Sequence, residues 1–385
     1  MKICFWGNIA NSINGNTEGG GELQIAILAE ALARVGHEVV VLDTNTTENF
    51  ITKDGIKVFK IVGWNSGIRY IRTFTHRLPK LYLSLKAQKA DIYYCRIRDF
   101  RHILAFYAAH KVNAKLIIGL ASDLDVMNFA KRFKFYYLEH KVDFWHIFSS
   151  ILNEIIYPWL FRNADLILAQ HIGQKDILLK KRIESLVFPN LFNSIVPQIK
   201  KTNLTEYFIY VGSLHKRKGF FEFYDLVKKT PTHKYIVIGQ PMDKMSFKYY
   251  EELKSFDNVS LLGRLSHSET LKHIANSKAM ISTSRMEGFP NIFIEAWACG
   301  VPVISLHVDP GEIIQSEKLG EVCFGNLDKM LEAMDNIINT DKISKRTKFY
   351  VEHNHELNNN KLKEINMLFS KIHNSVSDKQ LTKNL

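Results

Sequence analysis

Two carboxylates, Glu287 and Glu295, stand eight positions apart where an apolar run gives way to a polar turn and then to an apolar helix. The run at residues 279–281 predicts a strand. Pro290, which is tolerated at the first helical position, and the apolar residues after it predict a helix that ends at Gly300. In such strand–turn–helix units, ligands bind beyond the carboxyl ends of strands and against helix N-termini, which favour anions. The spacing therefore predicts a binding site for a polar ligand here.

The surroundings of the two carboxylates leave three interpretations open. Both could be ordinary solvated surface groups, although Glu295 lies among apolar residues and a buried carboxylate needs hydrogen-bond partners. Sugar or ribose hydroxyls would be suitable partners. A glycosidase-like acid pair needs carboxyl groups roughly 5 to 9.5 Å apart, and the sequence spacing does not exclude that distance.

Two further segments have residue types that suit phosphate binding. The predicted strand 207–211 leads into Ser213-Leu214-His215-Lys216-Arg217-Lys218-Gly219, whose cations could hold a diphosphate and stabilise its leaving charge. The predicted strand 2–7 is followed by a polar loop that ends in Gly19-Gly20-Gly21 before a helix at 22–35. A solvated basic turn and a flexible glycine turn are the alternatives.

The run E-G-F-P-N-I-F-I-E-A-W-A-C-G-V-P-V-I, residues 287–304, resembles the E-x7-E region of glycosyltransferase family four. These are retaining enzymes with the α/β GT-B fold, in which two Rossmann-like domains face each other across a cleft. The resemblance implies that the second domain binds most of a nucleotide-diphosphate sugar. Glu287 would contact the donor sugar hydroxyls as a catalytic residue, and Glu295 would bind the ribose. The backbone amides of Gly288, Phe289 and Asn291 would lie near the sugar and phosphates.

Other segments extend the resemblance and also depart from it. Residues 212–219 resemble the motif G-R-L-x-x-x-K-G, whose Arg and Lys hold the donor diphosphate. Lys218 matches the Lys and is the second catalytic candidate, but Ser213 stands in place of the Arg, so Lys216 or Arg217 would have to compensate.

The glycine-rich opening of the first domain is also similar to that of the family. Gly20 and Gly21 would face the donor phosphates and the acceptor. Many family members carry a His after the strand that corresponds to residues 115–119, and here Ser122 and Asp123 stand in that region as acceptor-side candidates. A helix cap or a turn is the alternative role for these two residues.

The composition is that of a two-domain globular protein. The chain has 385 residues, of which 46% are hydrophobic, and its four cysteines lack metal-ligand spacing, which is typical of reduced thiols in a cytosolic protein. We expect no signal peptide and no membrane span, and hence a cytoplasmic chain. The expected domains are residues 1–198 on the acceptor side, 199–345 for the nucleotide sugar, and 346–385 as a helical extension with a frayed tail.

The net charge of +12 is concentrated in the first domain. Residues 60–162 hold 17 Lys and Arg against 7 Asp and Glu, and aromatic residues are interleaved with the cations. Residues 130–161 are expected to be one long helical segment. It is either a packed helix with a solvated basic side or a surface that rests on anionic lipid at the inner face of the membrane. The cations proposed to face the lipid are Lys131, Arg132, Lys134, His140 and Lys141. The interleaved aromatic residues are Tyr70, Phe74, Phe133, Phe135, Tyr136, Tyr137, Phe144 and Trp145.

The resemblance implies a retaining transfer of a hexosyl unit from a nucleotide sugar to an acceptor hydroxyl, and the basic, aromatic surface suggests a lipid-linked glycan or polysaccharide intermediate as the acceptor. No cofactor and no metal are expected, because the family needs no bound metal and the one D-x-D motif, Asp123-Leu124-Asp125, lies in the first domain. Nucleic acid is not an expected partner, since the basic region lacks a recognised module. A non-catalytic nucleotide-sugar-binding partner of a transferase, and a GT-B epimerase or phosphorylase, remain the alternatives.

Overall fold

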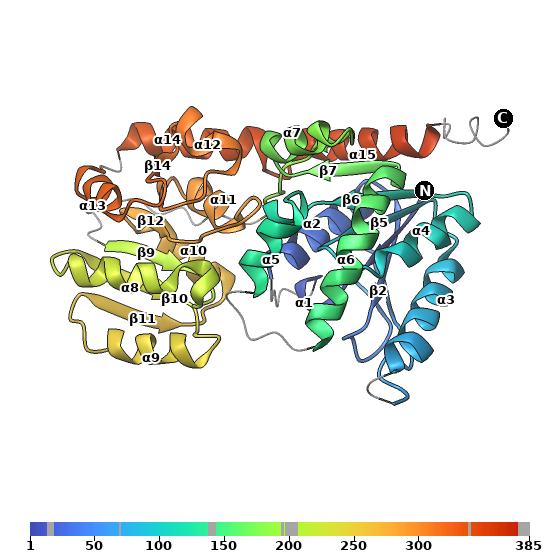
Figure 1. Ribbon diagram of the computed structural model, residues 1–385. Helices are drawn as coiled ribbons and strands as arrows, with labels where there is room; N and C mark the ends of the chain where they lie inside the picture. The colour runs from blue at the N-terminus through green and yellow to red at the C-terminus, as the bar shows by residue number, and fades with distance from the viewer. Residues whose placement is uncertain are drawn as a thin grey trace. The chain divides into compact units, whose positions relative to one another are not determined.

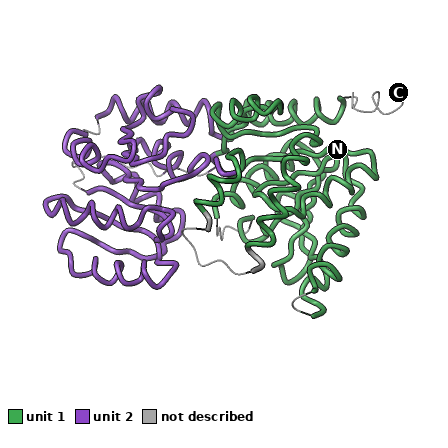
Figure 2. The backbone as a smooth tube through the Cα atoms, in the orientation of Figure 1, with its two compact units in different colours: residues 1–121, 125–191, 357–385 green, residues 122–124, 192–356 purple. Residues whose placement is uncertain are grey.

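The structure, a computed structural model, describes residues 1–13, 19–68, 71–137, 144–193, 196, 207–337 and 340–375. The chain forms two compact units, shown in Figure 2. Unit 1 contains residues 1–121, 125–191 and 357–385, and unit 2 contains residues 122–124 and 192–356. Each unit is built around one β-sheet with helices on both faces.

The sheet of unit 1 has the strand order β3-β4-β2-β1-β5-β6-β7-β8. All neighbouring strands are parallel except the short pair β3–β4. The strands are β1 (Lys2–Trp6), β2 (Glu38–Asp43), β3 (Phe50–Ile51), β4 (Lys57–Lys60), β5 (Ile92–Arg96), β6 (Lys115–Gly119), β7 (Leu166–Ala169) and β8 (Leu186–Val187). The central strands are apolar along their whole length because both faces of a parallel sheet are covered.

Helices cover the two faces of this sheet separately (Figure 1). One face packs against α3 (Leu78–Gln88), α4 (His102–Lys111), α6 (Phe144–Asn163) and α7 (Ile172–Lys180). The other packs against α1 (Ala10–Ile13), α2 (Gly20–Arg34) and α15 (Asn359–Asn374). A π-helical turn, η1 (Thr73–Arg77), precedes α3, and η2 (Asp123–Asp125) follows β6. The segment expected to form one long helix at 130–161 is two helices, α5 (Phe129–Tyr137) and α6, with residues 138–143 outside the described residues.

Unit 2 has an all-parallel sheet with the order β11-β10-β9-β12-β13-β14. Its strands are β9 (Tyr207–Val211), β10 (Lys234–Ile238), β11 (Val259–Gly263), β12 (Ala279–Ser282), β13 (Val303–Ser305) and β14 (Gly320–Val322). On one face lie α8 (Phe220–Lys229), α9 (Lys244–Leu253) and α13 (Leu327–Asn336). On the other lie α10 (His267–Ala275), α11 (Asn291–Ala298), α12 (Ile313–Ser316) and α14 (Asp341–Asn354). Two 3-10 turns, η3 (Lys216–Lys218) and η4 (Pro310–Glu312), follow β9 and β13.

The direction of strand addition reverses once in each sheet. In unit 2 the chain proceeds from β9 outward through β10 and β11, and then returns to place β12 on the other side of β9. In unit 1 the same reversal occurs between β1 and β5. In open α/β sheets, such a reversal leaves a crevice at the carboxyl ends of the two strands, and ligands bind there.

The units differ from the expected ranges at the C-terminal end. The main segment of unit 2 begins at residue 192 rather than 199, and residues 346–375 are divided between the two units instead of forming a separate extension. Helix α14 joins unit 2 because Val351 packs in the core beside α11, whereas α15 joins unit 1 because Ile365 and Phe369 pack against α2. The expected linker near residue 198 and the expected frayed tail after residue 375 fall mainly outside the described residues.

The turn after β9 approaches the turn after β12 too closely to admit a side chain. Gly219 has φ of +69°, and a Cβ at this position would lie 1.9 Å from the carbonyl oxygen of Thr283. Glycine is therefore required at this position for two reasons: the left-handed backbone conformation and the close approach to the Thr283 carbonyl. Gly263 at the end of β11 has nearly the same φ, +68°, but a Cβ there would meet no atom within 4 Å.

This pair of glycines gives a controlled stability test. Gly219→Ala should lower the free energy of unfolding by about 2–5 kcal/mol, since the left-handed strain and the overpacking add. Gly263→Ala carries the left-handed strain alone and should cost about 1–2 kcal/mol. Urea unfolding followed by circular dichroism measures both, and equal losses for the two variants would show that the Thr283 contact is not limiting.

Candidate functional site

Lys218 and Glu287, the two predicted catalytic residues, meet at the strand-order reversal of unit 2. Lys218 ends the 3-10 turn η3 after β9, and Glu287 lies in the loop between β12 and α11. The Lys218 Nζ donates to Glu287 Oε1 at 2.5 Å. Their side chains are 28% and 19% exposed, so the pair is accessible to a ligand without being freely solvated. The sequence placed both residues in loops but gave no evidence that they touch.

Hydrogen bonds from strand and loop residues hold these two loops together. The Tyr210 hydroxyl donates to the Lys218 carbonyl (2.9 Å), and Thr283 Oγ1 donates to the Gly219 carbonyl (2.7 Å). The backbone N–H of Arg285 donates to the carbonyl of Arg217 (3.2 Å). Burial raises the pKa of Tyr210 well above its ordinary value, so the phenol keeps the proton that it donates. Tyr210 and Thr283 therefore position the two loops. The sequence does not reveal this, because Tyr210 looks like an ordinary strand residue and Thr283 like an ordinary residue of the following turn.

An ion pair at the edge of the site adds a second tie between the same segments. Arg285 Nε donates to Glu222 Oε1 at 2.7 Å, which joins the loop after β12 to the first turn of α8. Burial lowers the pKa of the nearby His307, an effect that the Arg285 charge reinforces and the Glu222 charge opposes. The loop that carries Glu287 is thus bonded both to the turn after β9 and to the first turn of α8.

The predicted backbone contacts lie at the start of α11. Gly288 and Phe289 are buried, and Phe289 packs against Trp297 and His355 with ring centroids 6.2 and 4.8 Å apart. Asn291 is half-buried and is the first residue of α11, whose N-cap Pro290 makes no side-chain cap. The amide groups of an N-terminal turn without such a cap are suited to an anion.

Glu295 is buried in α11, at 8% exposure, and its partner is a residue that the sequence did not identify. His267 Nε2 lies 3.3 Å from Glu295 Oε1. The hydrogen bond and the negative charge of Glu295 raise the pKa of His267, against the smaller effect of burial. Ser266 and Glu269 form a capping box that begins α10, and this motif could have placed His267 at the carboxyl edge of β11 from sequence.

The other predicted residues are divided between the units. Ser213 and Arg217 are half-buried in the loop that carries Lys218. Gly20 and Gly21 form the first turn of α2 in unit 1, with Gly20 exposed.

Ser122 and Asp123 differ from their expected placement in the first domain. They belong to unit 2, where the backbone N–H of Asp123 donates to the carbonyl of Glu287 (3.2 Å). The second aspartate of the D-x-D motif, Asp125, is buried and accepts from the N–H of Ala121 (2.8 Å). In the part of the chain that is described, no group of three or more His, Cys, Asp or Glu side chains is arranged to hold a metal ion.

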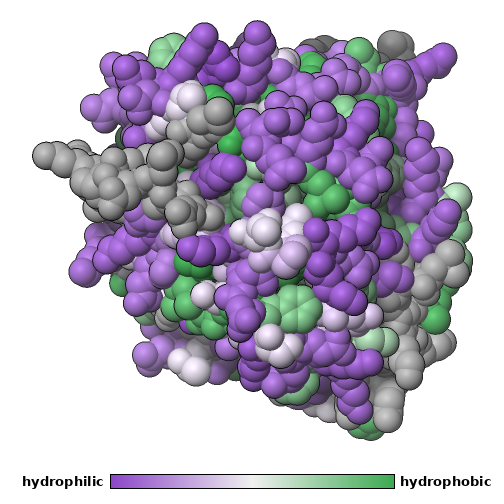
Figure 3. Space-filling view, turned by 90° about the vertical axis from the view of Figure 1, so that its left-hand side faces the viewer, coloured by the Kyte–Doolittle hydropathy of each residue, from purple (hydrophilic) through white to green (hydrophobic). Residues whose placement is uncertain are grey.

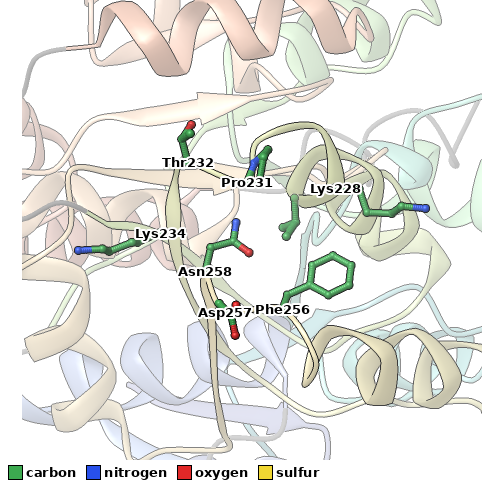
Figure 4. A pocket seen from close by; sticks show the side chains of 8 residues that line it. Lys228, Pro231, Thr232, Lys234, Phe256, Asp257 and Asn258 are labelled. Carbon is green, nitrogen blue, oxygen red and sulfur yellow. The ribbon is translucent and has the colours of Figure 1, made fainter.

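A pocket of about 580 Å³ lies away from the predicted site residues (Figure 4). Its lining includes Lys228, Pro231 and Thr232 before β10, and Phe256 and Asn258 before β11. These segments meet at the amino ends of the strands. Because α/β sheets bind ligands at the carboxyl ends, this pocket is not the expected ligand site.

Comparison with known proteins shows similarity to glycosyltransferases, mainly in unit 2. The family model described as glycosyl transferases group 1 matches residues 193–354, which cover nearly all of unit 2. An uncharacterized glycosyltransferase of Haemophilus influenzae is 25% identical over 160 residues, 39% of this chain and 45% of that protein. The N-acetylgalactosamine-N,N'-diacetylbacillosaminyl-diphospho-undecaprenol 4-alpha-N-acetylgalactosaminyltransferase of Campylobacter jejuni is 25% identical over 214 residues, 52% of this chain and 58% of that protein. The chain thus spans about half the length of these curated relatives.

The fold also matches solved structures along the whole chain. Sucrose-phosphate synthase from Thermosynechococcus elongatus superposes with a TM-score of 0.73 over 100% of both chains, at 14% identity. At this identity the likeness shows the fold alone. It confirms the predicted α/β fold, which is the two-domain GT-B fold of glycosyltransferases.

The His267–Glu295 contact predicts a pH dependence of stability. The folded-state pKa of His267 is raised above its ordinary value of 6.5, so its stabilising effect is fully present below pH 6.5 and is lost as the pH rises through the folded value. His267→Gln should therefore destabilise the protein more at about pH 5.5 than at about pH 8.5. Urea unfolding of both proteins at the two pH values measures this difference. In an NMR titration, Glu295→Gln should lower the pKa of His267, and an unchanged value would contradict the assigned cause.

Proposed function

We propose that this protein is a retaining glycosyltransferase that moves a hexosyl unit from a nucleotide-diphosphate sugar to an acceptor hydroxyl. The observation that carries the proposal is the Lys218–Glu287 pair, which lies at the strand-order reversal of unit 2 inside the segment matched by the glycosyltransferase family model. A cation and a carboxylate at this place suit the two halves of such a donor, the diphosphate and the sugar.

Lys218 would bind the diphosphate and stabilise the charge that develops on it as the glycosidic bond breaks. The N-terminal turn of α11, with Gly288 and Asn291, would add backbone donors to the same phosphates. Ser213 and Arg217 lie in the same loop as Lys218, and Arg217 would supply the charge that Ser213 does not. In this proposal the reaction needs no metal, because Lys218 and the N-terminal turn of α11 would compensate the negative charge of the phosphates.

Glu287 would accept hydrogen bonds from the hydroxyls of the donor sugar. In the ligand-free chain, Lys218 and Glu287 satisfy each other. A donor replaces this one contact with two, phosphate oxygens on Lys218 and sugar hydroxyls on Glu287. Partly exposed ion pairs contribute only about 0–1 kcal/mol, so the exchange is not opposed by a strong existing bond.

Glu295 would bind the ribose of the nucleotide through its two hydroxyls. Its carboxylate is nearly buried and is already held by His267, so it needs little reorganisation on binding. A carboxylate that accepts two hydroxyl donors is the usual ribose contact in dinucleotide-binding sheets. The role of His267 is to position Glu295.

The acceptor would be a lipid-linked glycan or a polysaccharide intermediate. The Campylobacter jejuni relative is named for an undecaprenol diphosphate-linked acceptor, which supports this class. Gly20 and Gly21 begin α2 at the carboxyl edge of the unit 1 sheet, where open α/β sheets bind their ligands and where a ligand of this unit would find backbone amides. Asp123 is a further acceptor-side candidate because its backbone bonds to Glu287.

One observation favours a second candidate, a nucleotide-sugar-binding protein without catalytic activity. Ser213 stands where the resembling family has an Arg that holds the diphosphate. With one cation fewer, the site could bind a donor without cleaving it. Release of nucleoside diphosphate from a bound donor, with or without acceptor, distinguishes the two functions.

Lys218→Ala should weaken binding of a nucleoside diphosphate by roughly 10- to 150-fold and leave the bare nucleoside unaffected, because a charge-assisted hydrogen bond contributes about 1.5–3 kcal/mol. Calorimetry with the two ligands measures the effect. Lys228→Ala, at the pocket of Figure 4, removes an exposed cation from the same unit and serves as the control. Equal losses of both ligands in Lys218→Ala would remove Lys218 from a phosphate role.

The proposed function is tested by screening nucleotide sugars for thermal stabilisation and then assaying transfer. A true donor at about 100 times its dissociation constant should stabilise the protein by about 2.7 kcal/mol. The anomeric configuration of the product, read by NMR, should match that of the donor. Inversion would refute the retaining mechanism, and stabilisation without turnover would support the non-catalytic alternative.

A further inference from the structure

The outer side of the helical layer α3–α4–α6 of unit 1 carries an unusual row of exposed apolar side chains. On α6, Ile147, Ile151, Ile155 and Trp159 recur every fourth residue and are 40%, 50%, 66% and 39% exposed; we call them the α6 stripe. Residues four apart lie on one face of a helix, so the stripe runs about 18 Å along α6. The buried residues Tyr157, Leu160 and Phe161 of the same helix face the sheet, which leaves the α6 stripe outward.

Neighbouring helices continue the stripe at both ends. Phe74 of η1, 49% exposed, packs edge-on against Phe148 at a centroid distance of 6.0 Å. Near the other end, Trp159 contacts Phe106 of α4 at 4.7 Å, and Tyr107 beside it is exposed. Contiguous exposed apolar surface of this kind is rare on soluble proteins unless something binds it.

Helix α5 adds an aromatic and basic edge to this surface. Phe129 and Phe133 are four residues apart, on one side of the helix, and both are exposed; Lys131 and Lys134 of the same helix are exposed as well. The Arg132 guanidinium joins α5 to α6 by donating to Glu154, from Nε at 2.7 Å.

This ion pair corrects one sequence prediction. Arg132 was expected to face a lipid surface, but it is 8% exposed and bound to Glu154, which also pairs with Arg98 at 3.2 Å. Phe74 and Phe133 are exposed as expected. Phe135, another of the predicted aromatic residues, is half-buried. His140, Lys141 and Tyr70, and the side chains of Tyr136, Tyr137, Phe144 and Trp145, lie outside the described residues.

The charge on these helices is almost entirely positive. In η1, α3, α4, α5 and α6 the single carboxylate is Glu154, already ion-paired. The lysines and arginines of the same elements are Arg77, Lys80, Lys86, Lys111, Lys131, Arg132, Lys134 and Arg162. A partner must therefore offer apolar surface and negative charge together, and an anionic phospholipid bilayer does so through its acyl chains and its headgroups.

The face of unit 2 that carries α8, α9 and α13 lacks this combination. Figure 3 shows the side where α8, α9 and α13 lie in Figure 1, and its apolar atoms form small groups separated by hydrophilic ones. On α9, Met245 and Phe247 are each 55% exposed but have Glu251 and Glu252 on the same helix. Among the described residues, no helix is long and apolar enough to cross a bilayer.

We propose that the α6 stripe, with Phe129, Phe133, Lys131 and Lys134 of α5, is a docking surface for an anionic phospholipid membrane. The apolar side chains enter the boundary between headgroups and acyl chains, and the two lysines reach the headgroup phosphates. Attachment is reversible and salt-sensitive, since it depends on cations that act within about 8 Å at physiological salt. This inference concerns a surface of unit 1 and does not depend on the proposed transferase activity.

Co-sedimentation of the full chain with vesicles tests the proposal, using phosphatidylcholine with and without phosphatidylglycerol at low and high salt and without nucleotide sugar. The wild type should bind the anionic vesicles and be released by salt. Lys131→Gln with Lys134→Gln should lower the partition coefficient about 30-fold. Ile151→Ser with Ile155→Ser should lower it by at least about tenfold.

The matched control is Met245→Ser with Phe247→Ser, which removes equally exposed apolar side chains from α9 and should not change binding. Unchanged far-UV circular dichroism and unfolding midpoints show that the variants are folded. The proposal would be overturned if the wild type did not bind the vesicles, or if it bound them no better than the α6 variant, Ile151→Ser with Ile155→Ser. So would self-association in lipid-free buffer that only the α6 variant abolishes, because the surface would then be an interface between copies of the chain.

Discussion

The structure of unit 2 depends on the close contact between Gly219 and the carbonyl of Thr283. This contact brings the turn after β9 against the turn after β12 at the single point where the strand order reverses. The Lys218–Glu287 pair follows from it. Lys218 precedes Gly219 directly, and Glu287 is four residues after Thr283, so the approach of the two backbones carries the two side chains into contact. A side chain at Gly219 would separate the loops and with them the cation from the carboxylate.

In the absence of a ligand, the charged side chains of the site are paired with one another. Lys218 and Glu287 neutralise each other, Glu222 neutralises Arg285, and His267 shares a hydrogen bond with Glu295. The partner of each carboxylate lies close to the end of a strand or the start of a helix: Lys218 follows β9, Arg285 follows β12, and His267 begins α10. In the proposed function, phosphate oxygens of the ligand replace Glu287 on Lys218, and sugar hydroxyls replace Lys218 on Glu287. Such preorganisation lets fixed charges act on a developing negative charge without first reorienting.

The sequence was sufficient for the elements that depend on local pattern. The strand, turn and helix around Glu295 were predictable because an apolar run, Pro290, and Gly300 with φ of +77° mark their ends. The resemblance to a glycosyltransferase family gave the GT-B fold, which local pattern alone does not specify.

Contacts between distant segments could not be predicted in this way. Nothing in the order of residues shows that the Tyr210 hydroxyl reaches the Lys218 carbonyl or that His267 lies beside Glu295, since these depend on how helices pack on the sheet. Arg132 was read as a surface cation because its neighbours are basic, but its ion pair with Glu154 joins residues 22 positions apart. The outward direction of the α6 stripe was hidden for the same reason. An apolar helix face looks like core until the packing shows which side the sheet occupies.

The central claim is that the strand-order reversal of unit 2 binds the diphosphate of a nucleotide sugar. A crystal structure of the full chain with a nucleoside diphosphate tests it most directly. We predict phosphate oxygens within hydrogen-bond distance of Lys218 Nζ and of the first amides of α11, with the Lys218–Glu287 contact broken and the ribose hydroxyls on Glu295. A nucleotide bound at the amino ends of β10 and β11, beside Lys228, with the Lys218–Glu287 contact intact, would contradict it.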